Sequence, residues 1–235
     1  MMKAIRNNIP NAITSLNLLF GCLAIIAAFN WDEPFRGGFQ GYQLAFILIA
    51  LAAVADFCDG LVARALHAVS NIGAELDSLA DLVSFGIAPA MVLYNIMMER
   101  WDVGSWAFAS MLIPVFGALR LARYNVDPTQ GTVFTGLPIP ANAIFWIGLT
   151  AWYADNRLPL WLVIVLIVAL SLLMVCRLRM FSLKMHNLTS LKENWAQYLQ
   201  IIATVAFVAF LGLPGLAAAI ALYVLLSIIK KETKE

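Results

Sequence analysis

Long apolar runs recur along the whole chain, separated by short stretches that carry charges, prolines or glycines. A helix that crosses the bilayer core needs roughly 20 predominantly apolar residues. Read on this basis, the pattern predicts an all-α integral membrane protein with about eight transmembrane helices. We expect them near residues 11–29, 41–58, 77–98, 104–122, 138–154, 158–176, 195–212 and 214–230.

The connections between these runs are short, so the pattern predicts a single membrane domain over residues 1–235. The longest polar stretch is a basic connection at residues 177–194, which is either an interfacial helix or a flank retained by its positive charge. The run at 11–29 can also be read as a signal peptide. Polar residues interrupt it and no clear cleavage site follows, so we interpret it as a span.

Lysine and arginine concentrate in alternate connections. Twelve of the fifteen lie at the two termini and in the second, fourth and sixth connections. Because basic residues are retained on the cytoplasmic side, this asymmetry predicts cytoplasmic termini and an even number of spans. The connection that contains Arg64 is therefore expected to be cytoplasmic.

Composition supports a membrane protein and excludes a water-soluble globule. The chain is 62% hydrophobic and 12% charged, and the charged fraction is about half that of a soluble domain. The net charge of +1 gives no reason to expect a nucleic-acid partner. Three cysteines, Cys22, Cys58 and Cys176, lack metal-type spacing and are expected to be small buried hydrophobic residues.

Four aspartates lie at the ends of apolar runs. Asp56 and Asp59 end the second run, and Asp77 and Asp81 begin the third. Spacings of three and four residues place each pair on one helical face, and two helices joined by a short connection run antiparallel, so the two faces can meet. A charge at the centre of a membrane helix costs on the order of 3 kcal/mol, so acidic residues there indicate a function.

An all-oxygen cluster without histidine or cysteine suits a hard cation such as Mg²⁺, Mn²⁺ or Ca²⁺. Converging carboxylates also repel one another unless a cation neutralises them. We therefore predict a divalent-metal site in the hairpin 56–81. Gly60 and Gly73 either let a bulky ligand approach the backbone or pack helices together. Arg64 can pair with the aspartates or bind a phosphate.

These residues form one spaced pattern, Asp56-x-x-Asp59-Gly60-x-x-Ala63-Arg64, followed by Gly73, Asp77 and Asp81. The pattern resembles the signature of the CDP-alcohol phosphatidyltransferases, integral membrane enzymes that join a CDP-activated group to an alcohol and release CMP. The resemblance implies that Asp56, Asp59 and Asp77 bind divalent metal, usually Mg²⁺ or Mn²⁺. It implies that Asp81 binds metal and also acts as the general base.

The same resemblance implies roles for further residues. The family's nucleotide and diphosphate contacts correspond to Gly60, Arg64 and Ser70. Asn11 and Thr14 resemble a segment that contacts the cytidine diphosphate, although polar residues also begin interfacial helices. The resemblance also implies a homodimer.

Three other stretches, at residues 84–90, 120–125 and 135–140, look like the phosphatidylserine synthase branch of this family. Together with eight rather than six spans, they imply that CDP-diacylglycerol is the phosphatidyl donor and L-serine the acceptor. The implied location is a cytoplasmic (inner) membrane of bacterial type, with the active site on the cytoplasmic side.

Transfer to serine needs a base, because a serine hydroxyl is a poor nucleophile at neutral pH. Asp81 is expected to accept its proton, while one or two metal ions neutralise the diphosphate. Arg120 and Arg123 share a helical face and either bind the serine carboxylate or are basic flanking residues. Weaker candidates for the serine pocket are Ser78, Ser84 and Asn125. His67 and His186 are expected to be solvated.

Three alternatives remain at this point. The first is a sister enzyme that uses glycerol 3-phosphate or inositol as the alcohol. The second is a cation or proton transporter, because membrane carboxylates often mark ion paths, although transporters usually hold them near mid-membrane on broken helices. The third is a non-catalytic lipid-binding scaffold, which would have no use for a base beside a metal cluster.

Overall fold

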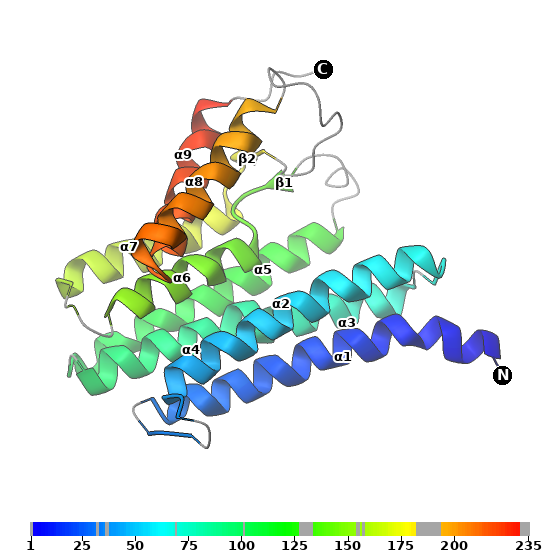
Figure 1. The fold of residues 1–235 in the computed structure, drawn as a ribbon, viewed down its shortest axis with the longest axis horizontal. Coiled ribbons are helices and arrows are strands. Elements are labelled where there is room, and N and C mark those ends of the chain that lie inside the picture. The colour runs from blue at the N-terminus through cyan, green and yellow to red at the C-terminus, as the bar shows by residue number, and fades with distance from the viewer. Residues whose placement is uncertain are drawn as a thin grey trace. The chain divides into compact units, whose positions relative to one another are not determined.

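The structure is a computed structural model that describes residues 2–31, 33–35, 38–68, 70–100, 102–126, 134–153, 156, 158–181 and 194–230. Helices dominate this part of the chain (Figure 1). The α-helices are α1 (Met2–Phe29), α2 (Gly41–Ala65), α3 (Asn71–Asp81), α4 (Ala88–Asn95), α5 (Leu112–Val126), α6 (Ile139–Tyr153), α7 (Leu160–Val175), α8 (Trp195–Leu211) and α9 (Gly215–Ile229). Between them lie the π-helices η1 (Leu82–Ile87) and η2 (Ile96–Arg100), the 3₁₀-helix η3 (Gly104–Met111), and the two-residue strands β1 (Phe134–Thr135) and β2 (Arg179–Met180).

The chain divides into two compact units, Met1–Ala118 and Leu119–Glu235. Each unit has its own packed helices, and each is described by itself below. The single membrane domain expected over residues 1–235 stays a prediction.

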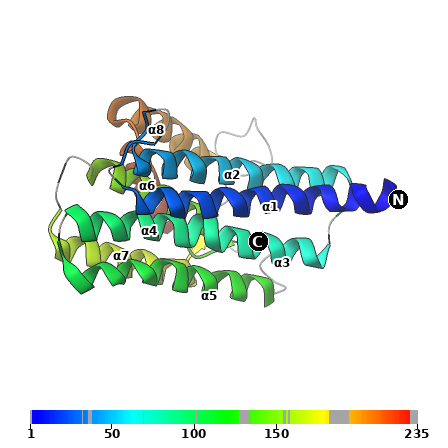
Figure 2. The same ribbon diagram turned by 90° about the horizontal axis from the view of Figure 1, so that it is seen from below.

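In the first unit, α1 and α2 lie side by side along their lengths (Figures 1 and 2). Small residues make this close approach possible, because they let helix backbones come near one another. The fully or almost fully buried alanines of the two helices are Ala24, Ala27, Ala28, Ala45 and Ala52. At the end of the hairpin the rings of Trp31 and Tyr42 stack with their centroids 4.7 Å apart.

A continuous helical stretch, Asn71–Glu99, contains α3, η1 and α4 and packs on α1. Helix η1 has the wider turn of a π-helix, and the Ala88 N–H that follows it donates to the Val83 carbonyl five residues back. The next residue, Pro89, has no N–H to donate to a helical hydrogen bond. Ser84 in η1 donates a hydrogen bond to the Asn17 carbonyl at 2.9 Å. A Cβ at Gly21 would collide with Ser84, so a glycine is required where α1 meets η1.

In the second unit, α9 packs against α6 and α8. Strands β1 and β2 pair antiparallel, with Phe134 opposite Met180. The Tyr223 hydroxyl of α9 donates to the Phe181 carbonyl just after β2, at 2.9 Å. This bond joins the strand pair to the helices of the same unit.

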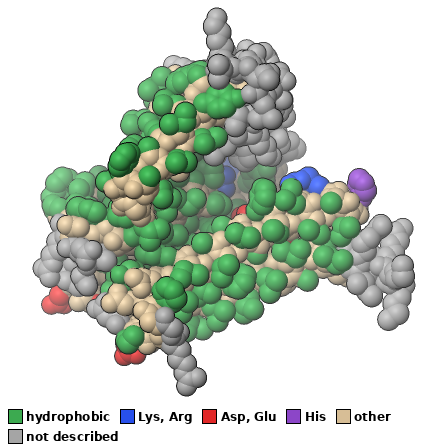
Figure 3. Space-filling view, in the orientation of Figure 1, with side chains coloured by type: hydrophobic (Ala, Val, Ile, Leu, Met, Phe, Trp, Pro, Cys, Tyr) green, Lys and Arg blue, Asp and Glu red, His purple; other side chains and the backbone are tan. Residues whose placement is uncertain are grey.

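The prediction of an all-α membrane protein is confirmed. Four helical stretches are long and apolar enough to cross a membrane: Asn8–Phe29, Gly41–Ala65, Asn71–Glu99 and Gly104–Val126. The other predicted spans coincide with the shorter helices α6 to α9, whose crossing of the membrane stays a prediction. Figure 3 shows hydrophobic side chains, in green, over the visible surface of α1 and α2. Their exposed members include Leu16, Leu23, Val54 and Phe57.

Two sequence expectations need correction. Cys22 is exposed and Cys58 and Cys176 are half-buried, so the prediction of buried cysteines was wrong; apolar side chains of a membrane helix can face lipid instead of protein. Helix α2 also continues past the predicted end at residue 58 to Ala65.

His67 is exposed, and its solvation stays a prediction. His186 and residues 182–193 of the basic connection lie outside the described residues.

Candidate active site

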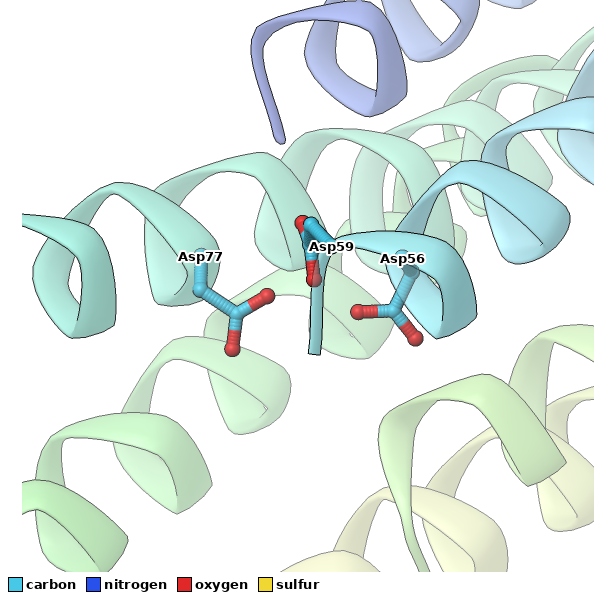
Figure 4. A group of neighbouring side chains, drawn as sticks. All are labelled: Asp56, Asp59 and Asp77. Atoms are coloured by element: carbon cyan, nitrogen blue, oxygen red, sulfur yellow. The ribbon is translucent and has the colours of Figure 1, made fainter. Parts of the chain in front are cut away.

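Three aspartates converge between α2 and α3. Asp56 and Asp59 come from α2 and Asp77 comes from α3, and one carboxylate oxygen of each lies within 4.8 Å of the others (Figure 4). Asp59 is buried, with 6% of its surface exposed, and the other two are half-buried. The spacing of three residues on α2 puts Asp56 and Asp59 on one face, and the packing of the first unit brings that face to Asp77.

Asp81 ends α3, one helical turn beyond Asp77, and interacts with the side chains of Asp56 and Asp77. Asn17 on α1 donates a long hydrogen bond from Nδ2 to Asp81 Oδ1, at 3.4 Å. Asn17 is completely buried. The fourth carboxylate therefore belongs to the same cluster and is held from α1.

Asn17 is a site residue that sequence reasoning missed. A signal was present, because Asn17 is a polar residue in an apolar run and follows Thr14 by three residues, so both lie on one helical face. The Thr14 hydroxyl donates to Asp59 Oδ2 at 2.6 Å. Helix α1 thus contributes a hydrogen-bond donor to one carboxylate from each of the two acidic helices.

A cavity of about 200 Å³ lies beside the aspartates, between α1, α2 and the start of α3. Its lining includes all six residues that the sequence analysis singled out for binding the CDP-lipid, five of them from the family resemblance and Gly73 as a glycine that lets a ligand approach the backbone. These are Asn11, Thr14, Gly60, Arg64, Ser70 and Gly73. Asp59 and Asp77 also line it, so the cavity is continuous with the carboxylate cluster.

The first turn of α3 and its N-cap contribute part of the cavity lining. Ser70 is the N-cap of α3, and its Oγ accepts a hydrogen bond from the Gly73 N–H at 3.0 Å. A Cβ at Gly73 would lie 3.0 Å from Asn11 Oδ1 and 3.1 Å from Ser70 Oγ, so this glycine allows α1 and α3 to approach. A Cβ at Gly60 would lie 3.5 Å from Arg64 Nη1, so a larger side chain there would enter the space beside the guanidinium.

The donor set fits a hard divalent cation. The clustered ligand atoms are carboxylate oxygens, with no histidine or cysteine among the described residues of the cluster. Two buried oxygens of this site, Asp77 Oδ1 and Asn17 Oδ1, accept no hydrogen bond from the described part of the chain. Because buried oxygens normally have a partner, this arrangement can hold a metal ion.

The candidates for the serine pocket divide between the two units. Ser84 is buried and donates to the Asn17 carbonyl, so it holds α1 against η1. Ser78 donates to the Ala74 carbonyl on its own helix at 3.1 Å. The remaining candidates, Arg120, Arg123 and Asn125, lie on α5 in the second unit. Arg123 donates to the Val175 carbonyl at 3.1 Å. Contact of these residues with serine stays a prediction.

Comparisons with known proteins show the family to which the chain belongs. Residues 7–155 match the CDP-alcohol phosphatidyltransferase family model. The chain is 37% identical over 236 residues to the CDP-diacylglycerol--serine O-phosphatidyltransferase of Mycobacterium tuberculosis, which covers 94% of this chain and 73% of the relative.

Two further relatives carry the same name. The Bacillus subtilis protein is 33% identical over 187 residues, which are 79% of this chain and 97% of the relative. The Methanocaldococcus jannaschii protein is 39% identical over 140 residues, which are 60% of this chain and 59% of the relative. The matched segment of the family model includes all four aspartates and the cavity beside them. The chain belongs to the CDP-alcohol phosphatidyltransferase family.

Proposed function

We propose that this enzyme transfers the phosphatidyl group of CDP-diacylglycerol to the hydroxyl of L-serine, giving phosphatidylserine and CMP. The names of the relatives from three organisms support the two substrates. The observation that carries the proposal is the cavity that joins Arg64 to the aspartate cluster. It combines a cation for a diphosphate with carboxylates for metal and for proton transfer.

The family uses divalent metals, and Asp56, Asp59, Asp77 and Asp81 are the residues that would hold Mg²⁺ or Mn²⁺ here. The quartet offers enough oxygen atoms for two ions, and Ca²⁺ is a further cation of the same hard class. When bound, a divalent cation neutralises charge on the diphosphate and on the CMP that leaves.

The cavity residues bind and orient the CDP-lipid. The planar Arg64 guanidinium can donate two parallel hydrogen bonds to a phosphate, and Gly60 beside it leaves room for that group. Ser70 and Gly73 line the cavity at the start of α3. Asn11 and Thr14 line the side formed by α1, where cytidine contacts are expected from the family pattern.

Asp81 accepts the proton of the serine hydroxyl while the serine oxygen attacks the phosphorus of the phosphatidyl group. The bond from that phosphorus to the CMP oxygen breaks, and CMP leaves with the electron pair. The hydrogen bond from Asn17 orients the Asp81 carboxylate for this role. For the serine carboxylate, the candidate cations are the guanidinium groups of Arg120 and Arg123, and Ser78, Ser84 and Asn125 are weaker polar candidates for contacts with serine.

The proposal also covers the membrane in which the enzyme lies and its oligomeric state. The charge asymmetry of the connections supports an inner membrane of bacterial type, with both termini and the active site on the cytoplasmic side. Serine then enters from water, while the acyl chains of the CDP-lipid remain in the leaflet. We also propose a homodimer, on the family resemblance.

The acceptor is tested by incubating the purified protein with CDP-diacylglycerol, Mn²⁺ or Mg²⁺, and one alcohol at a time. The alcohols are L-serine, glycerol 3-phosphate and inositol, and the lipid products are weighed by mass spectrometry. We expect phosphatidylserine with serine, in equal amount to released CMP, and no product with the other two. A phosphatidyl ester of glycerol phosphate or inositol in place of phosphatidylserine would identify the sister enzyme instead.

A further inference from the structure

Two buried hydrogen bonds connect α1 to the helical stretch that carries Asp81. Helix α1 runs alongside α3 and α4 and also packs on η1 (Figure 2). The Ser84 hydroxyl of η1 donates to the Asn17 backbone carbonyl at 2.9 Å, and Asn17 Nδ2 donates to Asp81 Oδ1 at 3.4 Å. Ser84 and Asn17 are both completely buried. Because Ser84 follows Asp81 by three residues, the two bonds and the chain between Asp81 and Ser84 form a closed ring that includes Asn17.

Gly21 makes room for Ser84 at the Asn17 carbonyl. It lies one helical turn after Asn17 on α1. A Cβ at Gly21 would collide with Ser84 Oγ and would lie 2.8 Å from Ser84 Cα. A larger residue at this position would therefore push Ser84 away from α1 and break its hydrogen bond to Asn17. The glycine and the serine form one matched contact between α1 and η1.

The backbone changes from an α-helix to a π-helix directly after Asp81. Helix α3 ends at Asp81 and η1 begins at Leu82. A π-turn contains more residues than an α-turn, so it changes which side chains after Asp81 face α1. Such turns inside α-helices occur frequently at functional sites. Here the π-helix carries Ser84, whose side chain meets α1 at the residue that also holds Asp81.

The burial of Ser84 favours an indirect role over the contact with serine for which it is a weaker candidate. Its hydroxyl has a single proton, and that proton is donated to the Asn17 carbonyl. Neither Ser84 nor Asn17 is among the residues that line the cavity beside the aspartates. An effect of Ser84 on the reaction therefore has to pass through Asn17 or through helix packing in general.

We propose that Ser84 is a positioning residue for the general base: it fixes the Asn17 backbone, and the Asn17 side chain in turn orients the Asp81 carboxylate. A base has to lie within hydrogen-bond reach of the proton that it removes, and a small misplacement of a reacting group costs much of the rate. This inference rests on the base role that the proposed function gives to Asp81. It does not depend on which alcohol is the acceptor.

A double-mutant cycle on the full-length protein in lipid nanodiscs tests whether Ser84 acts through Asn17. Ser84→Ala removes the hydroxyl, and Asn17→Leu removes the amide donor while keeping a similar shape. We expect kcat to fall about fivefold in Ser84→Ala, the factor that one neutral hydrogen bond supplies, and roughly 10–100-fold in Asn17→Leu. The double variant should match Asn17→Leu alone. The KM values for serine and CDP-diacylglycerol should stay unchanged throughout, because neither side chain lines the cavity.

Two further variants separate positioning from packing. Ser110 is completely buried like Ser84 and donates to the Ala107 carbonyl at 2.8 Å, in a helix that carries none of the four aspartates. Ser110→Ala should lower the unfolding temperature as Ser84→Ala does, but leave kcat unchanged. Ser84→Cys keeps the shape with a weak donor and should give a kcat between those of the unchanged enzyme and Ser84→Ala. Thermal unfolding checks that each variant folds, and Ser84→Cys replaces Ser84→Ala in the cycle if the latter does not.

Three results would overturn the positioning role. One is a double variant whose loss of kcat equals the product of the two single losses. Another is a raised KM for serine at unchanged kcat in Ser84→Ala, which would make Ser84 a substrate contact. The third is an equal loss of kcat in Ser84→Ala and Ser110→Ala, which would reduce the effect to packing. A failure of the proposed function is seen separately, in the unchanged protein: if it uses glycerol 3-phosphate or inositol instead of serine, the same cycle is measured with that alcohol.

Discussion

Hydrogen bonds from α1 orient two of the four carboxylates. Thr14 donates to Asp59 at 2.6 Å, and Asn17 donates to Asp81 at 3.4 Å. Groups that hydrogen-bond to a metal ligand fix its direction, and their loss typically lowers metal affinity or activity by about 10–100-fold. Single polar residues of α1 are therefore expected to control metal use and proton transfer separately.

Replacing Thr14 with valine tests the contact to Asp59. Thr14→Val removes the hydroxyl and keeps the shape, so we expect the Mn²⁺ concentration for half-maximal transfer to rise about tenfold. Thr14→Ser is the matched control, since it keeps the donor and should stay close to the unchanged enzyme. Equal metal requirements for the two variants would show that the 2.6 Å contact does not orient a metal ligand.

Replacing Asp81 with asparagine tests the base. The amide is nearly the same shape but cannot take the serine proton, so we expect transfer to fall by about 10²–10⁴-fold while CDP-diacylglycerol still binds. Binding is measured with radiolabelled CDP-lipid and transfer by incorporation of labelled serine. Full turnover by Asp81→Asn would remove Asp81 from the base role.

At the scale of the helix, the start of α3 combines two functions. Ser70 caps the helix by accepting the Gly73 N–H, and it also lines the cavity beside the aspartates. Capping stabilises the helix that carries Asp77 and Asp81, whereas the cavity is the site proposed to bind an anionic diphosphate. The two functions respond differently to a negative charge at residue 70.

Two substitutions separate these functions. Ser70→Ala removes the cap and should lower the free energy of unfolding by about 1 kcal/mol. Ser70→Asp keeps a capping oxygen but adds a negative charge to the cavity, so it should preserve stability and raise the KM for CDP-diacylglycerol. Thermal unfolding and KM are measured for both. An unchanged KM in Ser70→Asp would exclude Ser70 from the diphosphate side of the cavity.

The pattern of hydrophobic and polar residues in the sequence predicted the helices and the convergence of the acidic faces. It predicted the ends of the helices and the contacts between side chains less well. A charge ends an apolar run but not a helix, because the backbone hydrogen bonds continue through Asp56 and Asp59 to Ala65. Asn17 was missed because its partner, Asp81, is 64 residues away in sequence. The hydrogen bond from the Ser84 hydroxyl to the Asn17 carbonyl was likewise not predicted, because only helix packing creates this pairing.

At the scale of the whole molecule, the distribution of basic residues predicts on which side the active site lies. The connection after α2 follows Arg64, and the connection after α1 lies at the opposite end of α2. If α2 crosses the membrane, these two connections face opposite compartments. The positive-inside rule assigns the connection after α2 to the cytoplasm.

Cysteine labelling tests this orientation. With Cys22, Cys58 and Cys176 replaced by serine, an Ala65→Cys variant should react with a membrane-impermeant maleimide in inverted vesicles and not in right-side-out ones. Both Ala65 and Phe39 are exposed, and a Phe39→Cys variant should give the reverse result. The opposite pattern for both sites would invert the topology and move the active site to the other face.

The central claim is that α2 and α3 hold a divalent cation through a quartet of aspartates. The most direct measurement is a Mn²⁺ titration of the purified protein followed by electron paramagnetic resonance, in which the signal of free aqueous Mn²⁺ disappears on binding. We predict one or two ions bound by the unchanged protein, and loss of this binding in an Asp56→Asn/Asp77→Asn double variant that remains folded. The same Mn²⁺ binding in both proteins would contradict the account.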